Sequence, residues 1–240
     1  MSGTGPAPWL SVVVPAYNEE ESLAALHREL DAALAKLGRP AEIVLVDDGS
    51  RDGTLPAMRA LALEDPRVRV VALDGNHGQT AALDAGFRAA RGEVIATLDA
   101  DLQNDPADLA RLLEHLERAD VVNGVRAERR DSVVRRLSSR IANGVRNWAT
   151  GESVTDVGCS LRVMRAEYVR RIKLYRGLHR FLPTLLRMEG ARVIEVPVAH
   201  RPRAHGVSKY GIGNRLFAGL HDVFAVRWMQ GRMLRYRVRE

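Results

Sequence analysis

Short apolar runs alternate with helical repeats through the first half of the chain, and this alternation limits the fold more than any other feature. Five apolar runs are predicted to be strands: Leu10–Val14, Ile43–Val46, Val68–Leu73, Val94–Leu98 and Val121–Val122. Four segments with apolar residues at helical spacing lie between them: Glu19–Leu37, Thr54–Leu63, Gln79–Ala90 and Pro106–Leu116. This repeat predicts an α/β fold, with a mostly parallel central sheet covered by helices on both faces.

Acidic loops follow three of the predicted strands. They contain Asn18-Glu19, Asp47-Asp48 and Asp99-Ala100-Asp101. Because ligands of such sheets bind beyond the carboxyl ends of the strands, we expect these loops to meet at one edge. Asp99 and Asp101 are spaced to bind one Mg²⁺ or Mn²⁺ ion, with Gln103 adding an oxygen, since these ions prefer oxygen ligands. The alternative is that the two aspartates cap the following helix.

Two nucleotide-binding patterns are absent from the sequence. No Gly-x-Gly-x-x-Gly follows the first predicted strand, and no Gly-x-x-x-x-Gly-Lys-Ser/Thr occurs anywhere. The dinucleotide-binding and P-loop classes therefore lose their fingerprints.

Charge is distributed unevenly along the chain. Residues 1–120 carry 11 Lys and Arg against 21 Asp and Glu, whereas residues 121–240 carry 25 against 9. The second half therefore favours an anionic partner such as lipid headgroups, phosphates or nucleic acid. No nucleic-acid-binding motif is recognised, and three acidic loops would repel a polyanion, so a nucleic-acid partner is not expected.

Two segments of the basic half are predicted to lie at a membrane surface. Ser132–Thr150 combines an apolar stripe ending at Trp148 with arginines off that stripe, and Ile212–Met233 is the second candidate. The alternative is an ordinary core-facing helix with a solvated basic face. No apolar run approaches the roughly 18 residues that span a bilayer, and no signal peptide is read. The sequence therefore predicts a cytoplasmic protein, peripheral on the cytoplasmic face of the membrane.

Six motifs in order carry a family resemblance. They are Pro15-Ala16-Tyr17-Asn18-Glu19, Asp47 to Thr54, Asn76-His77-Gly78-Gln79, Asp99-Ala100-Asp101-Leu102-Gln103, Asp156 to Arg162, and Arg203-x-x-Gly206-x-Ser208-Lys209. The first four resemble family 2 glycosyltransferases, which have the GT-A fold. The last two resemble the branch that moves a sugar onto a polyprenyl phosphate, including dolichyl-phosphate mannose synthases and undecaprenyl-phosphate glucosyl- and aminoarabinosyl-type transferases. Gly78-Gln79 and Asp101 to Asn104 look closest to the aminoarabinose branch, which uses UDP-sugars.

The resemblance implies a role for each matching residue. The donor nucleotide is expected to contact Pro15, Tyr17, Glu19, Asp47, Asp48, Asn76, Gly78, Gln79, Asp99 and Ala100. Asp99, Asp101 and Gln103 are expected to hold the metal ion, and Asp101 and Asp156 to be the catalytic residues. The acceptor phosphate is expected to bind Arg126, Arg135, Ser139, Arg203 and Lys209. Residues 1–125 then form the donor half of the domain, and residues 126–240 form the acceptor half.

Elementary chemistry limits what Asp156 has to do. The family's usual base stands at this position, but the second pKa of a phosphate monoester is about 6, so the nucleophilic oxygen is mostly deprotonated at neutral pH. Asp156 is then either a base or a group that orients an arginine or a sugar hydroxyl. His179, His200 and His205 are predicted to be structural, and Cys159, the single cysteine, to be a packing residue.

These patterns favour an inverting glycosyltransferase that moves a sugar from a nucleotide-sugar, preferably a UDP-sugar, to a polyprenyl phosphate in cell-envelope glycan synthesis. Three alternatives stay open: a soluble family 2 enzyme with a saccharide or protein acceptor, a GDP-mannose-dependent polyprenyl-phosphate mannosyltransferase, and a basic membrane- or nucleic-acid-binding module. The sequence leaves open whether the chain forms a homo-oligomer.

Overall fold

The computed structural model describes residues 7–126, 144, 147–148, 150–151, 154–156, 158–202, 213–234 and 236. For residues 213–220 only the backbone is described. Of the residues predicted to bind the acceptor phosphate, Arg135, Ser139, Arg203 and Lys209 lie outside these ranges, as does most of the predicted helix Ser132–Thr150.

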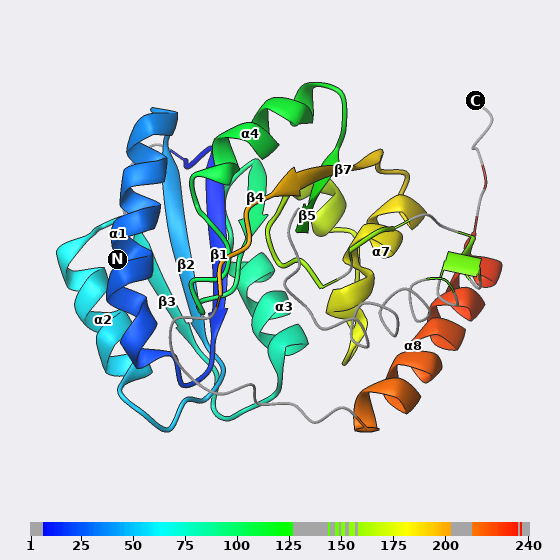
Figure 1. The fold of residues 1–240 in the computed structure, drawn as a ribbon, viewed down its shortest axis with the longest axis horizontal. Helices are drawn as coiled ribbons and strands as arrows, with labels where there is room; N and C mark the ends of the chain where they lie inside the picture. The colour runs from blue at the N-terminus through cyan, green and yellow to red at the C-terminus, as the bar shows by residue number, and fades with distance from the viewer. Residues whose placement is uncertain are drawn as a thin grey trace.

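A seven-stranded sheet forms the centre of the molecule, in the order β3-β2-β1-β4-β6-β5-β7 (Figure 1). Its strands are β1 Leu10–Ala16, β2 Ala41–Asp47, β3 Val68–Ala72, β4 Val94–Thr97, β5 Val121–Arg126, β6 Arg162–Arg165 and β7 Val193–Val198. Strand β6 runs antiparallel to both neighbours, and the other pairs are parallel. The predicted mostly parallel sheet is confirmed.

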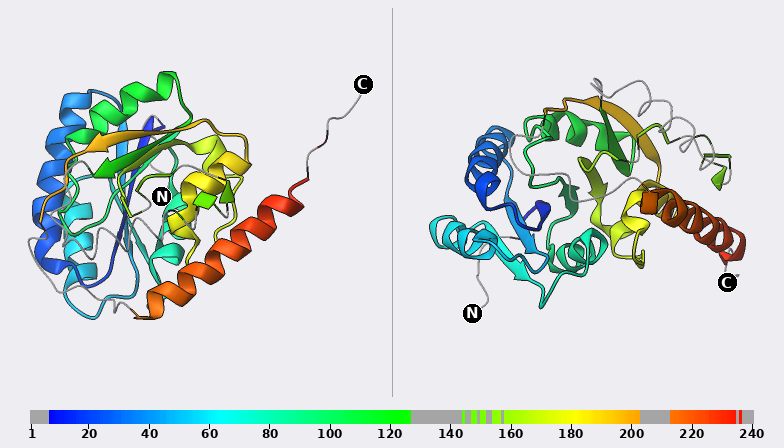
Figure 2. Two further views of the ribbon diagram at one scale, coloured as in Figure 1. Left: turned by 45° about the vertical axis from the view of Figure 1, so that its right-hand side comes forward. Right: turned by 60° about the horizontal axis from the view of Figure 1, so that its bottom comes forward.

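Helices cover both faces of this sheet because alternate strand residues point to opposite sides (Figure 2). The helical elements are α1 Glu20–Leu37, α2 Thr54–Glu64, α3 Gln79–Ala89, α4 Asp108–Glu114, η1 His115–Glu117, α6 Ala166–Val169, η2 Leu178–Phe181, α7 Leu182–Met188 and α8 Gly213–Arg232. In β1, Val12 and Val14 pack in the cluster that holds buried residues of α1, α2 and α4. Val13 packs in the other, with α3, α6 and α7. The α/β fold with two covered faces is therefore confirmed.

The structure adds elements that the apolar patterns do not reveal. Strand β6 is four residues long and holds a buried Arg162, and β7 is an edge strand that contains Pro197. Neither is a continuous apolar run, since a charged residue and a proline interrupt them. The strand expected at Val121–Val122 extends to Arg126, and the helix expected from Pro106 begins at Asp108.

Helix α8 packs on η2 and α7, on the side away from the sheet (Figures 1 and 2). Its buried residues Val223 and Val226 join a third cluster with Leu178, Phe181 and Leu185. Its opposite face is open, where Phe224 and Trp228 are 70% and 65% exposed. Within the described residues, no helix is both long enough and apolar enough to cross a bilayer.

Candidate active site

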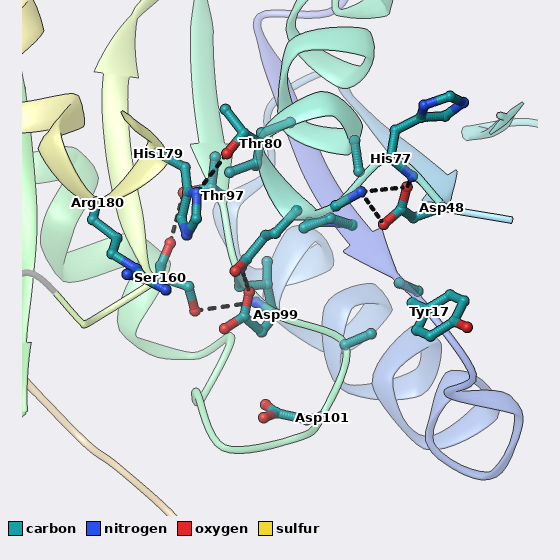
Figure 3. A pocket seen from close by; sticks show the side chains of 18 of the residues that line it. Tyr17, Asp48, His77, Thr80, Thr97, Asp99, Asp101, Ser160, His179 and Arg180 are labelled. Atoms are coloured by element: carbon teal, nitrogen blue, oxygen red, sulfur yellow. Dashed lines mark hydrogen bonds between the residues drawn. The ribbon is translucent and has the colours of Figure 1, made fainter. Parts of the chain in front are cut away.

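A cavity of about 630 Å³ opens at the carboxyl ends of β1, β2 and β4 (Figure 3). Most of the predicted donor residues line it: Pro15, Tyr17, Glu19, Asp48, Asn76, Gly78, Gln79, Asp99 and Ala100, together with Asp101. These residues are up to 86 positions apart in the sequence and meet because their strands end at one edge, as the topology requires.

Asp48 holds the loop between β3 and α3 at one end of this cavity. Its carboxylate accepts hydrogen bonds from the backbone N–H groups of His77 (2.8 Å) and Gly78 (2.9 Å) and from Nδ2 of Asn76 (3.1 Å). Burial raises the pKa of Asp48 above its ordinary value, although these N–H donors act in the opposite direction. Gly78 has a φ of 90°, which a residue with a side chain rarely adopts, so the sequence at this loop is constrained. Asp48 therefore shapes the wall that is predicted to meet the nucleotide.

Asp47 lies outside the cavity lining. It is 2% exposed, and its carboxylate accepts a hydrogen bond from the backbone N–H of Ser50 at 3.2 Å. Its side chain stabilises the turn after β2. Of the two neighbouring aspartates predicted for the nucleotide base, Asp48 is the one at the cavity.

Asp99 and Asp101 both reach the cavity from the loop after β4 (Figure 3). Oδ1 of Asp99 accepts a hydrogen bond from Nε2 of Gln79 at 2.8 Å, and its backbone N–H donates to Oγ of Ser160 at 3.2 Å. Asp101 is 6% exposed and accepts the N–H of Gln103 at 3.2 Å. Two carboxylates at a strand end form a hard oxygen donor set, and this set fits Mg²⁺ or Mn²⁺ with further ligands from a bound phosphate. No larger cluster of acidic, His and Cys side chains that could hold a metal occurs in the described part of the chain.

Gln103 does not line this cavity. Leu102, between Asp101 and Gln103, has a φ of 60°, and this left-handed residue turns the chain away. Nε2 of Gln103 donates instead to the backbone oxygen of Arg201 at 3.4 Å. Its predicted role as a metal ligand stays a prediction without support from this geometry.

The other end of the cavity is basic, and sequence reasoning missed it. It is lined by Arg162 of β6, by Arg176 just before η2, and by His179 and Arg180 of η2. Arg162 is buried and donates from Nε to Oδ1 of Asn123 at 2.7 Å. Burial, reinforced by the charges of Arg180 and Arg162, lowers the pKa of His179 to about 3. Arg162 ends the Asp156 to Arg162 motif, but no motif in the sequence marks His179, which meets its partner Thr80 across 99 positions.

Asp156 and Arg126 form an ion pair just outside the cavity lining. Nε of Arg126 lies 2.7 Å from Oδ2 of Asp156, and Nη2 lies 2.7 Å from Oδ1. The Asp156 carboxylate also accepts the N–H of Gly158 at 3.1 Å and is 3% exposed. This two-point pairing orients the guanidinium of Arg126, the one residue of the predicted acceptor set that the structure describes.

Comparison with known proteins identifies the family of this chain. Residues 11–173 match the model of glycosyl transferase family 2. The chain belongs to glycosyltransferase family 2. The family resemblance noted in the sequence is thereby confirmed, and the chain is a member of a family of sugar-transferring enzymes.

Curated relatives of this family 2 member are polyprenyl-phosphate sugar transferases. The dodecaprenyl-phosphate galacturonate synthase of Rhizobium johnstonii is 41% identical over 96% of this chain and 68% of its own length. The undecaprenyl-phosphate 4-deoxy-4-formamido-L-arabinose transferase of Pseudomonas aeruginosa is 46% identical over 85% of this chain and 61% of its own length. The chain thus spans about two thirds or less of the relatives that it matches.

Solved structures share the fold of this family 2 member. Glucosyl-3-phosphoglycerate synthase from Mycobacterium tuberculosis, in complex with Mn²⁺, UDP and phosphoglyceric acid, has a TM-score of 0.67, 19% identity, and coverage of 95% of this chain and 80% of that one. A mannosyltransferase from Pyrobaculum calidifontis, in complex with GDP-Man and Mn²⁺, has a TM-score of 0.63, 22% identity, and coverage of 97% and 66%. The predicted GT-A fold is confirmed.

Proposed function

We propose that this chain transfers a sugar from a nucleotide-sugar to a polyprenyl phosphate, with inversion at the sugar carbon. The observation that carries the proposal is the position of Asp99 and Asp101 in one cavity with the Asp48 loop. A carboxylate pair suited to a divalent ion beside a nucleotide-sized cavity is what a diphosphate donor needs. The names of the curated relatives supply the acceptor class.

Asp99 and Asp101 are the residues that would hold the metal ion. When bound, such an ion stabilises the negative charge that develops on the departing nucleoside diphosphate. Gln79 fixes one carboxylate and the N–H of Gln103 fixes the other, so both are oriented before a donor binds. The neighbouring structures with Mn²⁺ support a divalent ion of this type.

Arg126 is the acceptor-side residue that this proposal uses. Its guanidinium, held by Asp156, supplies positive charge for a phosphate monoester. An acceptor that arrives as a dianion attacks without first losing a proton, so positioning and charge carry much of the catalysis. The donor half, residues 1–125, and the acceptor half, residues 126–240, then meet at the loop that carries Asp156.

Transfer of label tests the proposed function. We expect sugar from a radiolabelled UDP-sugar to enter the organic phase only when undecaprenyl phosphate and Mn²⁺ are both present. Label transferred to a saccharide or protein without any lipid phosphate would establish the soluble alternative instead.

UDP is expected to bind more tightly than GDP. The prediction rests on the sequence at Gly78-Gln79 and Leu102-Gln103-Asn104. The fold alone does not distinguish the nucleotides, since one neighbouring structure contains UDP and another contains GDP-Man. Calorimetry with Mn²⁺ present measures both dissociation constants. A GDP affinity at least roughly tenfold higher than that for UDP, about 1.4 kcal/mol, would identify a GDP-sugar enzyme.

Peripheral binding to anionic membranes on the cytoplasmic face is part of the proposal. Phe224 and Trp228 stand one turn apart on the open face of α8, next to the exposed Arg227 and Arg232. Trp148, in the predicted interfacial segment, is 86% exposed. Aromatic side chains beside arginines suit a headgroup layer, in which apolar insertion and attraction to anionic lipid add.

Liposome co-sedimentation measures this binding. We expect it to rise with anionic lipid, to fall with salt, and to drop severalfold in Trp228→Ala and Trp148→Ala. Leu63→Ala is the matched control, since Leu63 is 90% exposed on α2 in the acidic half. Binding that ignores both lipid charge and the tryptophan substitutions would contradict membrane docking through these faces.

A further inference from the structure

The side chains of the cavity follow a fixed order from one end to the other (Figure 3). Tyr17 and Asp48 lie at one end, Asp99 and Asp101 lie in the middle, and His179 and Arg180 lie at the far end. A nucleotide-sugar has its base, diphosphate and sugar in the same linear order. With the diphosphate held at Asp99 and Asp101, the sugar falls at the end that holds His179 and Arg180.

His179 presents a fixed hydrogen-bond donor to this end. Oγ1 of Thr80 accepts the backbone N–H of Gly177 at 3.1 Å and lies 2.7 Å from Nδ1 of His179, to which its one hydroxyl hydrogen can be donated. We therefore assign the proton of the neutral ring to Nε2. The ring edge opposite Thr80 turns toward Ser160 and Asp99 in Figure 3. With a pKa of about 3, His179 stays neutral at physiological pH, so it donates to a ligand and does not serve as a base.

Arginines supply the remaining donors at this end. Arg162 and Arg176 line the cavity together with Arg180. Among the described residues, the half-buried Arg180 has no hydrogen-bond or ion-pair partner. Burial raises the pKa of Asp222 on α8, and the nearby charge of Arg180 acts in the opposite direction. A cation with no direct partner in a cavity is best stabilised by an anion that binds there.

We propose that the donor sugar is a hexuronate, whose carboxylate is bound by Arg180 and by Nε2–H of His179. The inference rests on the proposed function and names the class of its sugar. A carboxylate accepts hydrogen bonds without donating any, which matches a wall of donors, whereas a sugar hydroxyl also presents a hydrogen.

Matched donor pairs test the inference. UDP-glucose and UDP-glucuronate differ only in the group at C6, as do UDP-galactose and UDP-galacturonate. In calorimetry with Mn²⁺, we expect the uronate of at least one pair to bind roughly tenfold more tightly or better, since hydrogen bonds to charged groups have about this effect. Because His179 stays neutral, the preference should be constant between about pH 6 and pH 8. Equal affinities within both pairs would overturn the inference.

Three substitutions locate the effect. Arg180→Gln should abolish the preference and leave the affinity for UDP unchanged. His179→Leu should reduce the preference, while His179→Gln, whose amide N–H replaces Nε2–H, should retain more of it. Arg59→Gln removes an exposed arginine on α2 and should change nothing.

Each opposite result has a defined meaning. Weaker binding of UDP itself in Arg180→Gln would assign this arginine to the diphosphate, and a change confined to the KM for undecaprenyl phosphate would assign it to the acceptor. Either result overturns the inference while leaving the proposed function standing. Failure of the wild-type protein to transfer sugar from any of the four donors to undecaprenyl phosphate would contradict the proposed function itself.

Discussion

Replacing Asp99 or Asp101 by Asn is expected to abolish divalent-dependent turnover while leaving the fold intact. An amide keeps the shape of the side chain but removes the negative charge that binds a hard cation. Electrostatic stabilisation of a leaving group is often the largest catalytic contribution, so a loss of roughly 10³-fold or more in kcat is expected. Both carboxylates lie at the cavity, and neither forms the hydrophobic core of the sheet.

Three measurements separate this loss from misfolding. The variants should keep the wild-type circular dichroism spectrum, should lose the enhancement of UDP binding by Mn²⁺, and should be insensitive to EDTA. Asp31→Asn is the matched control, because Asp31 lies on the outer part of α1 with a half-exposed side chain. Full activity of either Asp99→Asn or Asp101→Asn in EDTA would contradict the proposed metal-binding role of these residues.

Asp156→Asn is expected to lower turnover by roughly 10- to 100-fold and to leave it measurable. Both carboxylate oxygens of Asp156 pair with Arg126, so the substitution misplaces the guanidinium instead of removing a proton acceptor. A misplaced binding group costs about this much in rate. If Asp156 acts through Arg126, the double variant with Arg126→Gln should lose no more than the worse single variant does.

A pH–rate profile of wild type and Asp156→Asn distinguishes the two roles. An essential base would make the deficit of the variant grow as pH falls through the second pKa of the acceptor, about 6. A positioning role gives profiles that stay parallel. No detectable product at any pH, with normal donor and acceptor binding, would show that Asp156 is the base.

Sequence patterns predicted the sheet well where strands are continuous apolar runs. The strands β1, β2 and β4 contain such runs, and so the loops after these three strands could be assigned to one edge of the sheet from the order of apolar runs alone. Strand β6 could not be found in this way because its buried Arg162 is stabilised by Asn123 from a neighbouring strand. A partner of that kind exists only after the sheet has formed.

The candidate site, too, could be predicted only in part. Donor residues in the loops were predicted because strand ends converge by topology, whereas the orientation of each side chain depends on local backbone geometry. Asp47 and Asp48 are neighbours, yet one is buried in its own turn and the other lines the cavity. Gln103 is directed away from the cavity by the left-handed conformation of Leu102. This conformation could not be predicted, because leucine rarely adopts it. The position of His179, and with it that of the neighbouring Arg180, could not be predicted, because the contact between His179 and Thr80 forms only in the folded chain.

The reversed direction of β6 links the proposed donor site to the proposed acceptor site. Because β6 runs against β4 and β5, the segment that enters it starts at the edge where those strands end. Asp156 and Ser160 therefore reach both proposed sites: Asp156 holds Arg126, and Ser160 accepts the N–H of Asp99 while donating to Asn104 at 2.7 Å. If a lipid phosphate shifts Arg126, we expect the shift to reach Asp99 through Asp156 and Ser160. Donor and acceptor affinities are thus expected to be linked, and such linkage is reciprocal, so each ligand alters the affinity for the other by the same factor.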